Sequence, residues 1–199
     1  MATYEAIYEV GESLKNIFKN NSDGLFGEND ITTSSPSDVK NEKLTIFLYQ
    51  VTENVYLRNQ NDYEYSISDN KEERKYPPKY LNLFYLLTPH LTPPPAPSVS
   101  PHVLLGKIIQ IIHENQEING SDLYGSLTGQ KLRLLLNPLS IDDLNKIWTI
   151  VLGSEKYKLS ISIEVSPVKI DSLRKEKITR VTEKEFKEHE KRRKKDDEN

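Results

Sequence analysis

Apolar and polar residues alternate most regularly near the middle of the chain. Residues 79–88 read K-Y-L-N-L-F-Y-L-L-T, and apolar side chains fill most positions of both alternating sets. A strand with two mostly apolar faces is covered on both sides, so we expect a central strand here. Pro77 and Pro78 precede it and Pro89 follows it. Because proline lacks a backbone donor, we expect these residues to stop strand pairing at each end.

Three other segments have strand-like patterns. Residues 43–53, K-L-T-I-F-L-Y-Q-V-T-E, are β-rich on both faces and are expected beside the central strand. Residues 157–170 alternate, with inward Leu159, Ile161, Ile163 and Val165 and outward Lys158, Ser160, Ser162 and Glu164. The outward face is expected to meet solvent or a partner. Residues 131–136 predict a short strand, whereas residues 31–33 are interpreted as a loop with an edge strand as the alternative.

Helical spacing predicts three helices. The first covers residues 3–19, with Thr3 as its cap and one apolar stripe. The second begins at Pro101 after Ser100, and its wide stripe is made by Val103, Leu104, Ile108, Ile111 and Ile112. The third runs from Ser140 to Gly153.

Polar segments divide the chain. Residues 54–78 predict a long loop, either functional or disordered, and residues 89–100 predict an extended proline-rich linker. We therefore predict one α+β domain at 1–171, with a mixed, largely antiparallel sheet packed by two or three helices. A charged extension follows at 172–199, open to one more strand at 178–181 and partly disordered toward its end.

Composition and charge exclude several classes of function. The chain has 199 residues, a net charge of −3 and no cysteine, which fits one domain and excludes disulfides, thiolate metal sites and cysteine nucleophiles. The first ten residues lack the basic and apolar regions of a signal peptide, so we expect synthesis in the cytoplasm without a signal peptide. Overall charge provides no attraction to nucleic acid.

Candidate catalytic groups are sparse. Histidines occur at His90, His102, His113 and His189 without metal-ligand spacing, and the sequence contains no phosphate-binding or nucleophile-elbow motif. His113 is interpreted as a cation at a helix end, and Asp142 and Asp143 as helix N-terminal charges. We therefore predict no enzyme activity, no cofactor, no metal and no small-molecule substrate.

The ordered segments together resemble a known family. They are Y-E-A-I-Y-E-V-G-E-S-L, L-T-I-F-L-Y-Q-V-T-E-N-V-Y-L-R-N, L-N-L-F-Y-L-L-T, H-V-L-L-G-K-I-I-Q-I-I-H-E-N and L-S-I-D-D-L-N-K-I-W before Y-K-L-S-I-S-I-E-V. In order and spacing they resemble the tail cap, or tube-terminator, proteins of extracellular contractile injection systems, typified by the antifeeding prophage and Photorhabdus virulence cassettes. The resemblance covers about residues 4–170 and departs from the family at the insert 61–75 and after residue 171.

This resemblance implies a phage tail-terminator-like fold and a structural role. Such caps form a hexameric ring at the distal end of the inner tube, stop tube growth and engage the last sheath layer. The implied partners are other copies of the chain, the inner tube protein and the sheath protein, in an assembled phage tail-like particle. Candidate contacts are Tyr49, Asn54, Arg58 and Asn59 in the matching segment, and Lys191, Arg192 and Arg193 in the charged tail.

Three other functions remain as alternatives. One is a tail-completion protein of an ordinary contractile phage. Another is a nucleic-acid-binding module that uses Lys191 to Lys195, although neighbouring acids cancel much of that field. The third is a hydrolase that uses His113 and Asp142, which the spacing of titratable residues disfavours.

Overall fold

A computed structural model describes residues 4–58, 63–68, 71–91, 99–151, 153 and 156–178. Its helical elements are α1 (Ala6–Asn20), α2 (Pro101–Glu114), the 3-10 turns η1 (Gly120–Asp122) and η2 (Gly125–Gly129), α3 (Ile141–Lys146) and the π-helix η3 (Ile147–Val151). The strands are β1 (Ile31–Thr32), β2 (Leu44–Glu53), β3 (Glu64–Ser68), β4 (Lys71–Lys75), β5 (Lys79–Pro89), β6 (Glu117–Asn119), β7 (Lys131–Asn137), β8 (Ile161–Ile170) and β9 (Lys175–Ile178).

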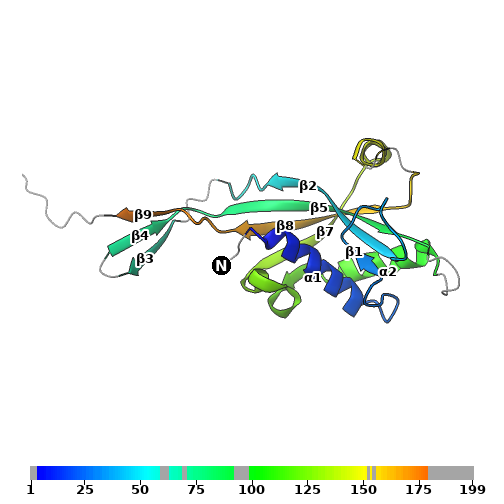
Figure 1. Ribbon diagram of the computed structural model, residues 1–199, viewed down its shortest axis with the longest axis horizontal. Helices are drawn as coiled ribbons and strands as arrows, with labels where there is room; N and C mark the ends of the chain where they lie inside the picture. Colours follow the sequence, from blue (N-terminus) through cyan, green and yellow to red (C-terminus); the bar gives the residue numbers. More distant parts are fainter. Residues whose placement is uncertain are drawn as a thin grey trace, which may run out of the picture.

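The strands form two sheets. The large sheet has six strands in the order β1-β2-β5-β8-β7-β6, antiparallel except for the β1–β2 pair. The small sheet has the order β3-β4-β9, and Figure 1 shows it projecting from one end of the large sheet. We call this small sheet the arm. The predicted mixed, largely antiparallel α+β fold is confirmed.

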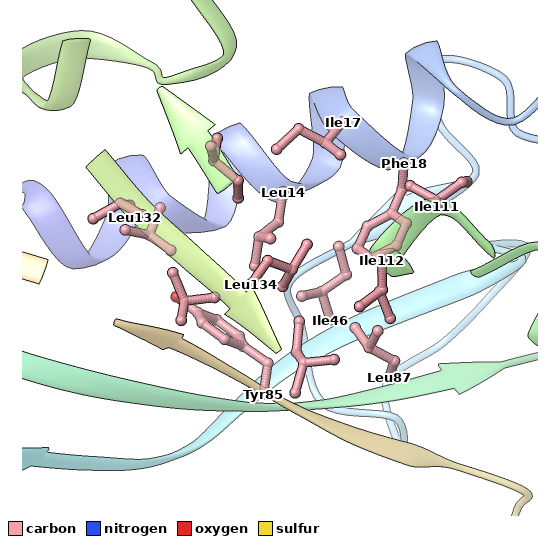
Figure 2. Close-up of a cluster of buried hydrophobic side chains, with 14 of the residues drawn as sticks. Leu14, Ile17, Phe18, Ile46, Tyr85, Leu87, Ile111, Ile112, Leu132 and Leu134 are labelled. Atoms are coloured by element: carbon pink, nitrogen blue, oxygen red, sulfur yellow. The ribbon is translucent and has the colours of Figure 1, made fainter. Parts of the chain in front are cut away.

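Helices α1 and α2 cover one face of the large sheet and form the main core (Figure 1). Figure 2 shows Leu14 and Phe18 of α1 and Ile112 of α2 pointing toward Tyr85 and Leu87 of β5. These side chains are at most 2% exposed. Each buried side chain of this size contributes roughly 1.5–3 kcal/mol, so this face holds most of the hydrophobic stabilisation.

The opposite face of the large sheet is covered in part. The α3–η3 segment, yellow in Figure 1, lies on this side and buries Ile147 and Trp148 over Leu86 of β5. Ser140 caps α3, with its hydroxyl oxygen accepting from the Asp143 backbone N–H at 3.1 Å, as predicted. The helix then widens into a π-turn, a feature common at functional sites.

Strand β5 ends at Pro89, one residue later than the sequence pattern predicted. Pro89 lies inside β5 and is the register partner of Leu44. One further hydrogen bond to the partner strand follows it, from the His90 backbone N–H to the Lys43 carbonyl at 2.8 Å. At the other end β5 begins at Lys79, directly after Pro78, as expected.

Four other expectations need correction. The predicted loop 54–78 contains strands β3 and β4, which pair with each other, and β4 also pairs with β9 of the predicted extension. The backbone hydrogen bonds between these strands hold the segment in an ordered sheet, although its polar side chains could not form an apolar core. Residues 31–33 were predicted to be a loop, but Ile31–Thr32 form the short edge strand β1, which was the alternative. Val103 is 55% exposed, because the buried stripe of α2 is narrower than predicted.

The last correction concerns the strand predicted over residues 157–170. It begins only at Ile161. Ser160 and Ser162 are buried, although alternation placed them outward, because other side chains satisfy their hydroxyl groups from the second face of the sheet. The Thr3 cap, residues 179–199 and the linker at 92–98 lie outside the described residues.

A buried carboxylate joins α1 to the η2 turn. Glu9 is 6% exposed and accepts from the Ser126 backbone N–H at 2.9 Å and from the Ser126 hydroxyl at 2.6 Å. The Ser13 hydroxyl oxygen also accepts from the Tyr124 backbone N–H at 2.8 Å. Gly125 lies between these contacts with φ +61°, and a Cβ there would overlap the Glu9 carboxylate.

We expect Gly125→Ala to destabilise the fold more than Gly120→Ala. Both glycines have positive φ, but a Cβ on Gly120 would meet no atom within 4 Å. The control therefore carries only the left-handed backbone cost of about 1–2 kcal/mol. The free energy of unfolding, measured in urea, should fall by roughly 1–3 kcal/mol more for Gly125→Ala. Equal losses would show that the Glu9 contact carries no constraint.

Candidate interaction surfaces

Asn54 is a turn-forming residue at the end of β2. It is 9% exposed, and its Oδ1 accepts from the backbone N–H groups of Tyr56 and Leu57, each at 3.1 Å. Its Nδ2 donates to Asn82 Oδ1 of β5 at 2.8 Å. This is the Asx-type turn that asparagine favours after a strand. Asn54 therefore holds the turn in place and presents its neighbours.

Those neighbours are two large exposed side chains. Val55 is 67% exposed and Tyr56 is 90% exposed. We call them the Val55–Tyr56 knob. Sequence reasoning selected Asn54 and passed over the two residues after it. The sequence signal for this turn was an asparagine directly after a strand, since such an asparagine favours a turn that exposes the two residues after it.

Arg58 lies on the surface beside the knob. Its Nε is 3.8 Å from the Glu53 carboxylate, and its side chain is 65% exposed. Glu53 also accepts from Lys79 Nζ at 2.6 Å. This hydrogen bond is the main cause that lowers the pKa of Glu53, and the charges of Lys79 and Arg58 add to it. Asn59, Lys191, Arg192 and Arg193 lie outside the described residues.

Tyr49 is an internal polar contact of the second sheet face. Its hydroxyl is 2.9 Å from the Ser162 hydroxyl, and Asn137 Nδ2 donates to both oxygens at 3.2 Å. Its ring centroid is 6.4 Å from that of Phe84. The network joins β2, β8 and β7 under the α3–η3 segment. Of the predicted contact residues in the described part of the chain, Arg58 is the most exposed.

An apolar pocket of about 290 Å³ opens beside α3. Its apolar wall is formed by Leu136, Pro138, Leu139, Leu144 and Ile161. The nearby helical segment exposes Ile141 by 84% and Ile150 by 77%. Apolar residues on opposite sides of a helix are typical of a helix that is buried all round. Because Ile141 and Ile150 are exposed in the single chain, we interpret this surface as one that a partner protein covers. We call the pocket the α3 pocket.

A second, larger hollow of 490 Å³ lies at the ends of β5 and α2. His90, His102, Lys40 and Lys158 contribute to its lining. His90 is 6% exposed, and its Nε2 lies 3.1 Å from Thr45 Oγ1. Burial lowers the pKa of His90 to about 4, and the Lys158 charge adds to this effect.

The described part of the chain holds no group of three or more acidic, histidine or cysteine side chains that could bind a metal ion. Within that same part, no helix has the length and apolar content needed to cross a bilayer. His113 is in the last turn of α2, 3.4 Å from Gln116, and Asp142 is in the first turn of α3. The residues of the hydrolase alternative thus lie on separate helices, and in the described part of the chain no hydrogen bond joins His113 to Asp142.

Comparison with known proteins gives a consistent result. The family model for the Pvc16 N-terminal domain matches residues 9–184. A search among curated proteins gives no match. Among solved structures, the fold is similar to a sheath/tube terminator of the extracellular contractile injection system PVC in its extended state, with a TM-score of 0.64 and 16% identity. It is also similar to the tube-terminating cap of the anti-feeding prophage, with a TM-score of 0.60 and 16% identity.

The chain is shorter than those two structures. The first match covers 92% of this chain and 64% of the solved chain, and the second covers 89% and 60%. This chain therefore spans less than two thirds of either solved chain. The predicted resemblance to tube-terminator proteins is confirmed.

Replacement of Asn54 should loosen the knob. In Asn54→Ala the Tyr56 and Leu57 N–H groups lose their acceptor, and we expect a loss of roughly 1–3 kcal/mol in the free energy of unfolding. Amide exchange at those two residues should become faster. Asn54→Asp is the matched control, because a carboxylate keeps the acceptor and loses only the donor to Asn82. If both variants exchange alike, the side-chain oxygen does not hold the turn.

Acid should destabilise the protein through His90. In the folded chain its pKa is about 4, against an ordinary value of 6.5, so the unfolded chain binds the proton more strongly. The contribution of neutral His90 is complete above about pH 6.5 and is lost as the pH falls through 4, with a limiting slope of about 1.4 kcal/mol per pH unit. Urea midpoints measured across this range should fall less steeply for His90→Gln. Parallel curves for the two proteins would contradict this assignment.

Proposed function

Because the chain belongs to the family of Pvc16 N-terminal domains, we propose that it is a structural protein that caps a contractile injection system. In this proposal it forms a hexameric ring at the distal end of the inner tube and sheath. The ring ends tube growth and anchors the last sheath layer. The protein works as part of the assembled phage tail-like particle.

One observation carries the proposal. The similarity to a sheath/tube terminator extends over 92% of this chain with a TM-score of 0.64, so it is a likeness of the whole fold and not of one motif. A match confined to the α1–α2 core would have supported only a general α+β domain.

The distribution of buried surface supports an assembly role. One face of the large sheet is closed by α1 and α2, whereas the other keeps exposed apolar residues on α3–η3. A ring requires two different surfaces on each copy that meet head to tail. Stable contacts of this kind bury on the order of 800 Å² per partner, and a half-covered sheet face can supply that area.

The arm suits contact with a second partner. Its strands are joined across the sheet by Arg74–Glu176 at 2.6 Å and Lys175–Glu73 at 3.1 Å. The Arg174 guanidinium also lies 4.1 Å from the centre of the Tyr76 ring. Figure 1 shows the arm beyond the helices of the described chain. In the proposed ring it extends away from the core, where it is available to sheath subunits.

Termination follows from the difference between the two ends of the ring. One end copies the surface that a tube ring offers to the next, so it binds the last ring. The other end lacks a matching surface, so no further ring is added. This mechanism requires positioning and no chemical step, and the proposal is accordingly a non-enzymatic one.

Deletion of the gene tests this function. Electron microscopy of particles from the deletion strain should show tubes of uncontrolled length and sheaths lost from the tube. Complementation with the unaltered gene should restore uniform, capped particles. As a direct measurement, the purified protein should form six-membered rings in native mass spectrometry. Normal capped particles in the deletion strain would overturn the proposal.

A further inference from the structure

The Val55–Tyr56 knob has the properties of an interface anchor. Tyr56 is 90% exposed, although it is held on a turn whose Tyr56 and Leu57 N–H groups donate to Asn54 Oδ1, and Asn54 Nδ2 in turn donates to Asn82 of β5. A fixed turn loses little conformational entropy when it binds. Tyrosine is among the residues that dominate binding energy at interfaces, since its ring is apolar and its hydroxyl can form a hydrogen bond.

The α3 pocket has the matching composition. Its apolar wall suits a tyrosine ring, and Asn137, Ser160 and Ser162 also line it. The amide oxygen of Asn137 can accept from a phenolic hydroxyl, whereas the Ser160 and Ser162 hydroxyls already bond within the chain. The pocket volume of about 290 Å³ is large enough for an aromatic side chain. Leu136 at its rim is 48% exposed, so an occupant would remove further apolar surface from water.

The surroundings of the knob and the pocket carry opposite charge. Beside the knob are one carboxylate, Glu53, and two cations, Arg58 and Lys79, which both pair with it. Helix α3, which borders the pocket, carries two carboxylates, Asp142 and Asp143, and one cation, Lys146, which pairs with Asp143. The first group is therefore positive by one charge and the second is negative by one. Such complementarity sets orientation and partner choice at interfaces.

A single copy cannot join its own two surfaces. Glu53, next to the knob, is the register partner of Leu81, whereas Ile161 of the pocket is the register partner of Leu87. Six residues of β5 therefore separate the two places, or about 20 Å at the usual rise of a strand. The end of β2 and the yellow α3–η3 segment are correspondingly apart in Figure 1. Both surfaces need a second chain.

We propose that copies of this chain pack head to tail, with the Val55–Tyr56 knob of one copy in the α3 pocket of the next. The inference rests on the proposed ring and names its contact. The knob and the pocket are different surfaces, so the contact is heterologous, and rotation about a common axis closes it into a ring. The positive group beside the knob meets the negative group beside the pocket.

An exchange of charge tests this pairing. Arg58→Glu makes the knob group negative, and Asp142→Arg makes the pocket group positive. Each variant alone brings like charges together at every contact, and the protein concentration needed for ring formation should rise about tenfold or more. An equal mixture should recover rings that alternate the two chains, because both kinds of contact are then complementary. Native mass spectrometry distinguishes these rings by mass.

The outcomes separate the interface from the function. If each variant forms rings alone as the unaltered protein does, or the mixture fails to recover them, the proposed contact is overturned while the capping function stands. If the unaltered protein forms no ring even with tube present, the proposed hexameric ring is overturned, and the proposed contact is overturned with it. Circular dichroism of each variant confirms that the monomer is folded.

A cysteine pair provides an independent test. The chain has no cysteine, so Tyr56→Cys and Leu136→Cys in one chain create the only thiols. Mild oxidation of the assembled protein should yield a ladder of covalent multimers on a non-reducing gel. Tyr4→Cys with Leu136→Cys is the matched control, because Tyr4 is also exposed (83%) but lies outside the knob. A ladder from the control alone, or bonds only within one chain, would overturn the contact.

Discussion

Unequal burial of the two faces of the large sheet is the constraint on which the rest of the structure depends. Helices α1 and α2 close one face with a continuous apolar core, and no residue of that core is more than 6% exposed. A domain of this size needs one such core for stability. Once this face is closed, the second face is free to carry polar networks and partly exposed apolar groups. The molecule thus combines a rigid support with an open surface.

The second face combines a small buried apolar cluster with a polar network, and it also exposes apolar side chains. The hydroxyls of Tyr49 and Ser162 bond with Asn137 beneath α3–η3, while Ile141 and Ile150 extend outward. Buried polar groups that satisfy one another rigidify a structure. The exposed isoleucines therefore belong to a rigidly supported segment, and such a surface can form an interface with little rearrangement.

The arm has a different physical basis. A three-stranded sheet is stable by itself only with an apolar face or a covering layer. The described side chains of this sheet are instead joined by ion pairs and by arginine–tyrosine contacts, including Arg74 over the Tyr63 ring at 4.7 Å. Exposed ion pairs contribute little each and weaken in salt. The described ion pairs therefore add little to the stability of the arm, whose strands β4 and β9 lie next to β5 and β8 along the chain.

The sequence by itself determined the elements with strong periodicity. The apolar stripes of α1 and α2, the Ser100 and Ser140 caps, and strands β2, β5 and β7 all follow from local rules that hold wherever these segments are placed. The same local patterns in order were also sufficient to indicate the family, since the family is defined by that order.

Only the tertiary structure decided the arm and the candidate contacts. Strands β4 and β9 are about one hundred residues apart in register, for example Arg74 with Glu176, and their polar composition contains no period that predicts pairing. Asn54 was selected from the sequence, but its side chain proved to be buried beneath Val55 and Tyr56. The direction of a side chain at a strand end depends on the turn that follows and on the neighbouring strand, and neither is encoded within the segment itself.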